Sequence, residues 1–149
     1  MSLSRAKRLQ PVVDMAEKAE RDAARQLGHC QGVVSQAEAK LGELERYRDD
    51  YQQQWINQGS QGVSGQWLIN YQRFLTQLEL AVEQQWQSIQ WHKANLEKAR
   101  AAWQQRYARL EGLRKLVQRY LNEARLAEDK REQKLLDELA QRLVERDDG

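Results

Sequence analysis

The sequence has few of the residues that build sheets, disulfide frameworks and turns. Its 149 residues include one proline, one cysteine and eight glycines, and Ile, Val and Thr together account for only 12. Strands depend on β-branched residues, so this composition argues against a β-rich fold. A single cysteine, Cys30, cannot form an internal disulfide, and we therefore expect a reducing compartment.

Long apolar runs are also missing. The first residues, MSLSRAKRLQ, lead into no apolar stretch typical of a signal peptide. No segment approaches the roughly 18 apolar residues that cross a bilayer. The formal net charge is only +2, so the charge balance gives no general signal for nucleic acid. We expect a soluble cytoplasmic protein that can still associate with a membrane complex.

Helix-forming residues are abundant instead. Ala, Glu, Lys, Leu and Arg contribute 73 of the 149 residues, a composition typical of long helices and coiled coils. Three glycines lie close together in residues 57–65. Glycine adopts positive φ readily and costs about 1 kcal/mol inside a helix, so this segment is predicted to be a loop. Ser64 is positioned to cap the helix that follows.

Apolar residues recur every seven positions on both sides of this loop. Before it, the repeat consists of Leu9, Ala16, Ala23, Cys30, Ala37, Leu44 and Tyr51, with a companion column of Val13, Leu27, Val34, Leu41 and Trp55 that Glu20 and Arg48 interrupt. After it, the repeat consists of Leu68, Leu75, Val82, Ile89, Leu96, Trp103, Leu110, Val117 and Ala124. Its companion column consists of Tyr71, Leu78, Ala99, Leu113, Tyr120 and Ala127, interrupted in the middle by Gln85, His92 and Arg106. Such heptads indicate a coiled coil.

The pattern predicts an all-α fold in a single domain, residues 1–149. We expect a helix over about 11–57, a loop over about 58–65 and a helix over about 66–146, paired as an antiparallel coiled-coil hairpin. Pro11 suits the first turn of a helix, where its missing N–H costs nothing.

The second predicted helix is much longer than the first and overhangs it. If the helices pair outward from the loop, residue 11 faces about residue 112, and residues 113–146 lack a partner within the chain. An apolar stripe nevertheless continues there, first through Leu113, Val117, Tyr120 and Leu121, then in a shifted register through Leu135, Leu139 and Leu143. We expect a second copy or another protein to cover this stripe. The alternative is a frayed tail.

No motif predicts catalysis, a cofactor or a small-molecule substrate. The loop glycines are not followed by the Lys-Ser or Lys-Thr of a phosphate-binding loop. His29 and Cys30 project about 100° apart on a helix, and His92 is distant in sequence, so no metal site is expected. The many carboxylates alternate with basic residues, as on solvated helix surfaces. We therefore expect a protein that is not an enzyme.

Two regions stand out as binding surfaces. Residues 100–119 carry six basic residues against Glu111 alone; an acidic protein surface fits this helix better than DNA does, since no nucleic-acid fold signature accompanies it. A solvated exterior is the alternative.

The second region is the loop end, where aromatic residues are more numerous than one helix–helix seam can cover. Part of this aromatic surface is therefore expected to bind protein rather than only to clamp the loop. The loop aromatics are Tyr47, Tyr51, Trp55, Trp67, Tyr71 and Phe74, and Trp86 and Trp91 lie further along.

The loop is followed by Trp67-Leu68-Ile69-Asn70-Tyr71-Gln72-Arg73-Phe74 and then by Leu78-Glu79-Leu80-Ala81. Together with Tyr47-Arg48-Asp49-Asp50-Tyr51 before the loop, these segments resemble the flagellar export protein family FliJ. The segments 23–28 and 130–138 fit as well, and the likeness covers about residues 14–142. Residues 1–10 and Pro11 find no counterpart in it.

The resemblance implies an antiparallel coiled coil similar to the central stalk of rotary ATPases. It implies a cytoplasmic, non-enzymatic component of the flagellar type III export apparatus, at the cytoplasmic face of the membrane beside the flagellar basal body. Its implied partners are a hexameric export ATPase, that ATPase's regulator, the membrane export gate and export chaperones, with no nucleic acid.

The resemblance also assigns residues to these contacts. The export-gate face comprises Leu44, Tyr47, Tyr51, Phe74, Leu78 and Ala81, extended by Lys40 and Gln85. The basic part of the second helix is expected against the ATPase ring, through Arg106, Arg109, Leu113, Arg114, Val117, Arg119 and Tyr120. Three other hypotheses stay open: the stalk of a virulence-type secretion system, a homodimeric coiled-coil scaffold, and a nucleic-acid binder that uses residues 100–119.

Overall fold

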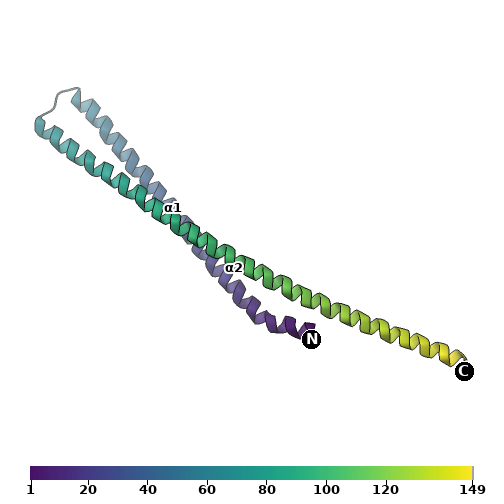
Figure 1. Ribbon diagram of the computed structural model, residues 1–149. Helices are drawn as coiled ribbons and strands as arrows, with labels where there is room; N and C mark the ends of the chain where they lie inside the picture. Colours follow the sequence, from purple (N-terminus) through teal and green to yellow (C-terminus); the bar gives the residue numbers. More distant parts are fainter. Residues whose placement is uncertain (149) are drawn as a thin grey trace. The chain divides into compact units, whose positions relative to one another are not determined.

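The computed structural model describes residues 1–148, which form two helices and no strand. Helix α1 spans Ser2–Gly59 with 58 residues, and helix α2 spans Gly65–Asp148 with 84 (Figure 1). The predicted all-α hairpin with a longer second helix is confirmed. The chain divides into two compact units: unit 1 comprises Met1–Asp22 and Gln104–Gly149, and unit 2 comprises Ala23–Trp103. That the whole chain forms one domain stays a prediction.

Unit 2 contains the loop, which reverses the chain within residues 60–64 and is shorter than predicted (Figure 1). Gly62 has a φ of 83°, which L side chains rarely adopt, so glycine is needed there. The predicted cap at Ser64 is confirmed. Its Oγ accepts a hydrogen bond of 3.1 Å from the backbone N–H of Trp67 and so satisfies one unpaired donor of the first turn of α2.

The seam of unit 2 follows the predicted heptad columns. The buried residues are Val34, Ala37, Tyr71, Leu78, Ile89 and Ala99, from both helices. One polar side chain enters this seam: the Gln85 amide donates a 2.9 Å hydrogen bond across it to the backbone C=O of Ala37. Gln85 interrupts an apolar column, and a polar side chain at such a position fixes the register of paired helices.

Unit 1 contains the start of α1, which begins at Ser2, and the predicted start near residue 11 is therefore wrong. Pro11 lies inside the helix. Because proline has no N–H, the C=O of Lys7 lacks its usual helical donor, and an interior proline costs about 3 kcal/mol. The helix continues through Pro11 because the residues before it are held by tertiary contacts.

These contacts involve the first two turns of α1 and residues 120–123 of α2. Ala6 is only 5% exposed. The Arg5 guanidinium lies 5.8 Å from the centre of the Tyr120 ring, and Ser2 Oγ donates a 3.1 Å hydrogen bond to the Glu123 carboxylate. Ala6 lies seven residues before Val13 and so continues the companion column, which the sequence analysis had begun at Val13.

Within unit 1, the start of α1 therefore packs along more of α2 than predicted. The buried cluster of unit 1 is Val13, Ala16 and Leu110, with Leu113 and Val117 packed against it. The prediction that α2 loses its partner after about residue 112 is wrong, because α1 is longer than expected.

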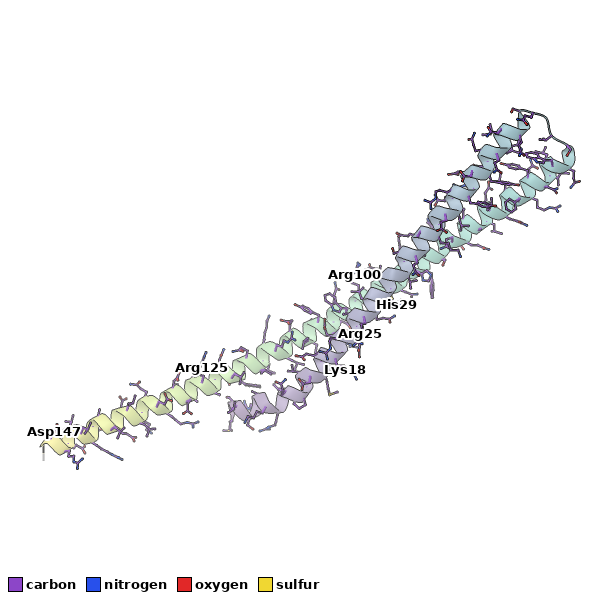
Figure 2. The ribbon with its side chains drawn as sticks, turned by 180° about the vertical axis from the view of Figure 1, so that it is seen from behind. Lys18, Arg25, His29, Arg100, Arg125 and Asp147 are labelled. Atoms are coloured by element: carbon purple, nitrogen blue, oxygen red, sulfur yellow. The ribbon has the colours of Figure 1, made fainter. Side chains whose placement is uncertain are left out.

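The last part of α2 has no covering helix, and every residue over 125–147 is exposed. Figure 2 labels Arg125 and Asp147 at the two ends of this stretch, where no second helix of unit 1 accompanies α2.

Candidate protein-binding surfaces

An aromatic cluster occupies the loop end of unit 2, with Tyr71 at its centre. The Tyr71 ring stacks on Tyr51, Trp55 and Trp67, with centroid separations of 4.9, 5.4 and 5.6 Å. Tyr71 is 7% exposed. Each such aromatic pair contributes about 0.5–1.5 kcal/mol beyond the burial of its area. The Tyr51 and Trp55 rings of α1 therefore hold α1 to Tyr71 of α2 beside the loop, whereas the Trp67–Tyr71 pair lies within α2.

Two further rings extend the cluster toward solvent. Phe74 meets the rings of Tyr51 and Tyr47 edge-on, at 4.7 and 6.2 Å between centroids. Phe74 is half-buried, whereas Tyr47 is 54% exposed. The inner rings of the cluster thus clamp the hairpin, and its outer edge leaves aromatic surface uncovered; that this edge binds protein stays a prediction.

The predicted export-gate residues follow one face of each helix in unit 2. On α1 their spacing is four, three and four residues, and on α2 it is the same, which keeps each set on one side of its helix. Lys40 and Tyr47 are exposed, and Leu44, Tyr51, Phe74, Ala81 and Gln85 are partly exposed. Leu78 is buried and Gln85 is bonded to Ala37, so these two support the surface from within.

The environment of Tyr71 also affects its ionisation. Burial raises the pKa of the Tyr71 phenol above its ordinary value, and the nearby Tyr51 and Glu79 raise it further. Because each of these effects disfavours a phenolate, the hydroxyl stays neutral at physiological pH.

Most of the predicted ATPase-contact residues in unit 1 are already engaged within the chain. Leu113 and Val117 pack on the buried cluster, and Tyr120 lies under Arg5. Arg119 pairs with Glu123 at 3.4 Å. Such exposed ion pairs contribute at most about 1 kcal/mol, so a partner can replace them at low cost.

Arg114 is the most fully paired of these arginines. Its guanidinium bonds Glu111 at 3.1 Å and Glu17 at 3.3 Å, and these hydrogen bonds, the one to Glu111 first, raise its pKa. Arginine is cationic at any physiological pH, so the pairing positions the side chain without changing its charge.

Arg106 and Arg109 are different, because neither forms an ion pair within the described residues. Both line a groove of about 310 Å³ in unit 1. Its apolar side comes from α1 and consists of Val12, Met15, Ala16 and Ala19. Met15 is 74% exposed. Sequence reasoning missed this apolar side, although the spacing of Val12, Met15 and Ala19 places them on one helix face.

The exposed stretch of α2 in unit 1 carries large apolar side chains. They are Leu126, Leu135, Leu136, Leu139, Leu143 and Val144, between 53% and 62% exposed. Contiguous apolar surface of this kind marks an interaction site more often than an ordinary exterior. Only Leu135, Leu139 and Leu143 had been singled out from the sequence.

Within residues 1–148, no group of three His, Cys, Asp or Glu side chains is arranged to hold a metal ion. Neither described helix contains an apolar stretch long enough to traverse a bilayer.

Comparison with known proteins decides the family. The family described as "Flagellar FliJ protein" matches residues 5–149. The chain belongs to the FliJ family. The Flagellar FliJ protein of Escherichia coli (strain K12) is 35% identical over 133 residues, which cover 89% of this chain and 90% of the relative. The Flagellar FliJ protein of Salmonella typhi is 36% identical over 139 residues, which cover 93% and 94%.

This result confirms the resemblance inferred from residues 67–74 and with it the assignment to flagellar protein export. It also corrects one detail. The FliJ match begins at residue 5, so it includes Pro11 and most of the N-terminal segment for which the sequence suggested no counterpart.

Proposed function

We propose that this FliJ family member is a non-enzymatic coupling component of the flagellar type III export apparatus. In this proposal it links the hexameric export ATPase, with its regulator, to the membrane export gate, and it also handles export chaperones. It acts in the cytoplasm, at the membrane face of the flagellar basal body. The observation that carries the proposal is the exposed stretch of α2 over residues 125–147, in which the leucines are more than half exposed.

The ATPase contact is assigned to unit 1. An exposed helix with a row of leucines is typical of a surface that a partner covers. The groove beside Arg106 and Arg109 adds two cations that no carboxylate of the described residues pairs, which favours an acidic partner surface. The paired residues Arg114 and Arg119 would join this contact by exchanging their carboxylate partners.

The export-gate contact is assigned to the outer edge of the aromatic cluster in unit 2. Tyr47, Phe74 and Lys40 supply its accessible surface. Aromatic side chains are the commonest anchors of protein interfaces. The packing of Tyr51 and Leu78 beneath them keeps this edge rigid, which lowers the entropy lost on binding.

The hydrolysis rate of the cognate export ATPase tests the first contact. It is measured alone, with the full chain, and with a chain that ends at residue 124. That end retains the contacts of Tyr120 and Glu123 with the start of α1. We expect stimulation by the full chain that is lost on shortening. Equal stimulation by both chains would move the contact away from the exposed stretch.

A matched pair of double variants separates this surface from general hydrophobicity. One carries Leu139→Ser and Leu143→Ser, at sites 53% and 62% exposed, and the other carries Ile69→Ser and Leu80→Ser in unit 2, at sites 52% and 55% exposed. Only the first should lose stimulation. If both lose it equally, the assignment to unit 1 fails.

Binding to the purified cytoplasmic part of the export gate tests the second contact. Phe74→Ala is expected to weaken binding, but it also removes packing against Tyr51. Tyr47→Ala removes an exposed ring with one edge contact and so reports on the surface itself. Trp86→Ala, at a site 51% exposed outside this face, is the control. Unchanged binding in both test variants would contradict the assignment.

A homodimeric scaffold is the second candidate, because the same apolar stretch over residues 125–147 also fits a second copy of this chain. Light scattering at micromolar concentration distinguishes the two. A stable dimer that the Leu139→Ser and Leu143→Ser double variant dissociates would favour the scaffold, and a monomer would favour a foreign partner.

A further inference from the structure

Unit 2 contains a groove that belongs to neither of the surfaces assigned above. Its volume is about 470 Å³, and both helices line it. The lining residues are Gln26, His29, Cys30 and Val33 of α1 with Trp91, His92, Asn95, Lys98 and Ala99 of α2. Both histidines and the single cysteine of the chain are therefore in one place. His29 and Arg100, labelled in Figure 2, mark the level of this groove on the two helices.

One wall of the groove is apolar and accessible. Trp91 is 64% exposed, and its ring lies edge-on to the His92 ring at 5.2 Å. Val33 and Ala99 continue the apolar surface inward. An exposed indole beside a depression is the typical anchor point for a partner's aliphatic or aromatic side chain.

The polar lining consists of groups that donate hydrogen bonds, and it includes no Asp or Glu. Lys98 supplies an ammonium group, Gln26 and Asn95 supply amides, and the two histidines supply ring N–H groups. The Gln26 amide N–H donates a 3.7 Å hydrogen bond to the sulfur of Cys30, which is a weak acceptor. Each of these groups can donate a hydrogen bond, although the amides and neutral imidazoles can also accept one. Because no carboxylate adds negative charge, the lining suits an anionic ligand.

The charges around the groove make Lys98 the available cation. Lys93 pairs with Glu38 at 3.6 Å, and Arg100 pairs with Glu97 at 2.8 Å. Lys98 has no such partner within the described residues. One free permanent charge with neutral donors around it suits a single carboxylate better than a polyphosphate, which requires several cations or a ring of backbone N–H groups.

We propose that this groove binds a short acidic segment of a protein partner, in which an aliphatic or aromatic side chain precedes or follows a carboxylate. The apolar side chain packs on Trp91 and Val33. The carboxylate accepts hydrogen bonds from Lys98 and from the groove's imidazole and amide groups. This proposal does not depend on the assignments of the ATPase and gate contacts, since none of its residues belongs to them.

A phage-displayed library of random peptides is the probe. The full chain is panned after depletion of the library on a double variant with Trp91→Ala and Lys98→Gln, which removes phages that bind elsewhere, including the aromatic loop end. We expect the recovered peptides to be enriched in Asp or Glu next to Leu, Phe or Trp. Recovery of no specific peptides, or of peptides without acidic residues, would overturn the proposal.

One recovered peptide is then labelled with fluorescein, and its affinity is measured by fluorescence anisotropy. Lys98→Gln and Trp91→Ala should each weaken it on the order of tenfold, the effect of losing a charge-assisted hydrogen bond or a buried aromatic anchor. Lys93→Gln and Trp86→Ala are the matched controls, because Lys93 is a paired lysine nearby and Trp86 is an exposed tryptophan outside the groove. Both should leave the affinity unchanged.

Three outcomes would refute the proposal at this step. Equal weakening in the controls would indicate a general charge or hydrophobic effect. Unchanged affinity in both test variants would place the peptide elsewhere. Displacement by inorganic phosphate or a nucleotide at the same concentration as the unlabelled peptide would identify a phosphate site. Circular dichroism of each variant confirms that helicity is retained.

Discussion

Tyr71 is expected to contribute more to the stability of unit 2 than any exposed aromatic residue does. Its ring is 7% exposed and stacks on three others. Replacing a buried aromatic side chain by alanine costs about 3–5 kcal/mol, and three stacked pairs at about 0.5–1.5 kcal/mol each are consistent with that range. The cluster lies at the end of the hairpin, where neighbours can relax, so we expect Tyr71→Ala to cost about 3 kcal/mol.

Urea titration measures this cost, with circular dichroism reporting on the helices and tryptophan fluorescence reporting on all five tryptophans, of which Trp55 and Trp67 stack on Tyr71. Tyr47→Ala is the matched control: its ring is 54% exposed and makes one edge contact at 6.2 Å, so we expect a loss of about 1 kcal/mol or less. If the two variants unfold at the same urea concentration, the cluster does not clamp the hairpin.

Three smaller perturbations test other contacts. The pKa of Tyr71 is raised above 10.0 in the folded chain. The neutral phenol therefore stabilises the folded state below pH 10, and this stabilisation is lost as the pH rises through the folded pKa. Tyr71→Phe should make alkaline unfolding, measured by circular dichroism, depend less steeply on pH. Gln85→Leu loses the hydrogen bond to Ala37 but completes an apolar column of the seam. We expect a higher urea midpoint together with a less uniquely defined helix register, which would broaden the amide NMR signals. Both Ser64→Ala and Ser64→Gly remove the cap on Trp67, but glycine adopts the N-cap backbone conformation more readily. We expect the free energy of unfolding to fall by about 1 kcal/mol in Ser64→Ala and by only a few tenths in Ser64→Gly. Equal shifts of the urea midpoint in the two variants would contradict this.

The sequence predicted the seam well because heptad spacing translates directly into a helix face. Val13, Ala16, Ile89 and Leu110 are all buried where the columns placed them. The start of α1 was missed because two signals conflicted at Pro11. Proline prefers the first turn of a helix, whereas Ala6 continues the apolar repeat before it, and the contacts that accompany the longer helix involve residues more than a hundred positions away.

The candidate sites were predictable only in part. The aromatic residues at the loop end were recognisable by number and position, but which of them clamp and which remain exposed depends on ring geometry that no spacing rule contains. The groove of Trp91, His92 and Lys98 was not predicted at all. Its α2 residues lie between Trp91 and Ala99, far from His29 and Cys30 in sequence, so only the register of the two helices brings them together.

The uncovered part of α2 has a consequence for how its backbone exchanges with solvent. A helix that packs against nothing opens by fraying and by local unfolding, at a free-energy cost far below that of the seam. Amide protons over residues 125–147 should therefore exchange within seconds to minutes, while those near Leu110 and Ile89 are protected for much longer. A partner that covers this stretch has to supply the protection that the chain lacks. Amides that slow when a partner is added then mark its footprint on α2, residue by residue, without any variant having to be made.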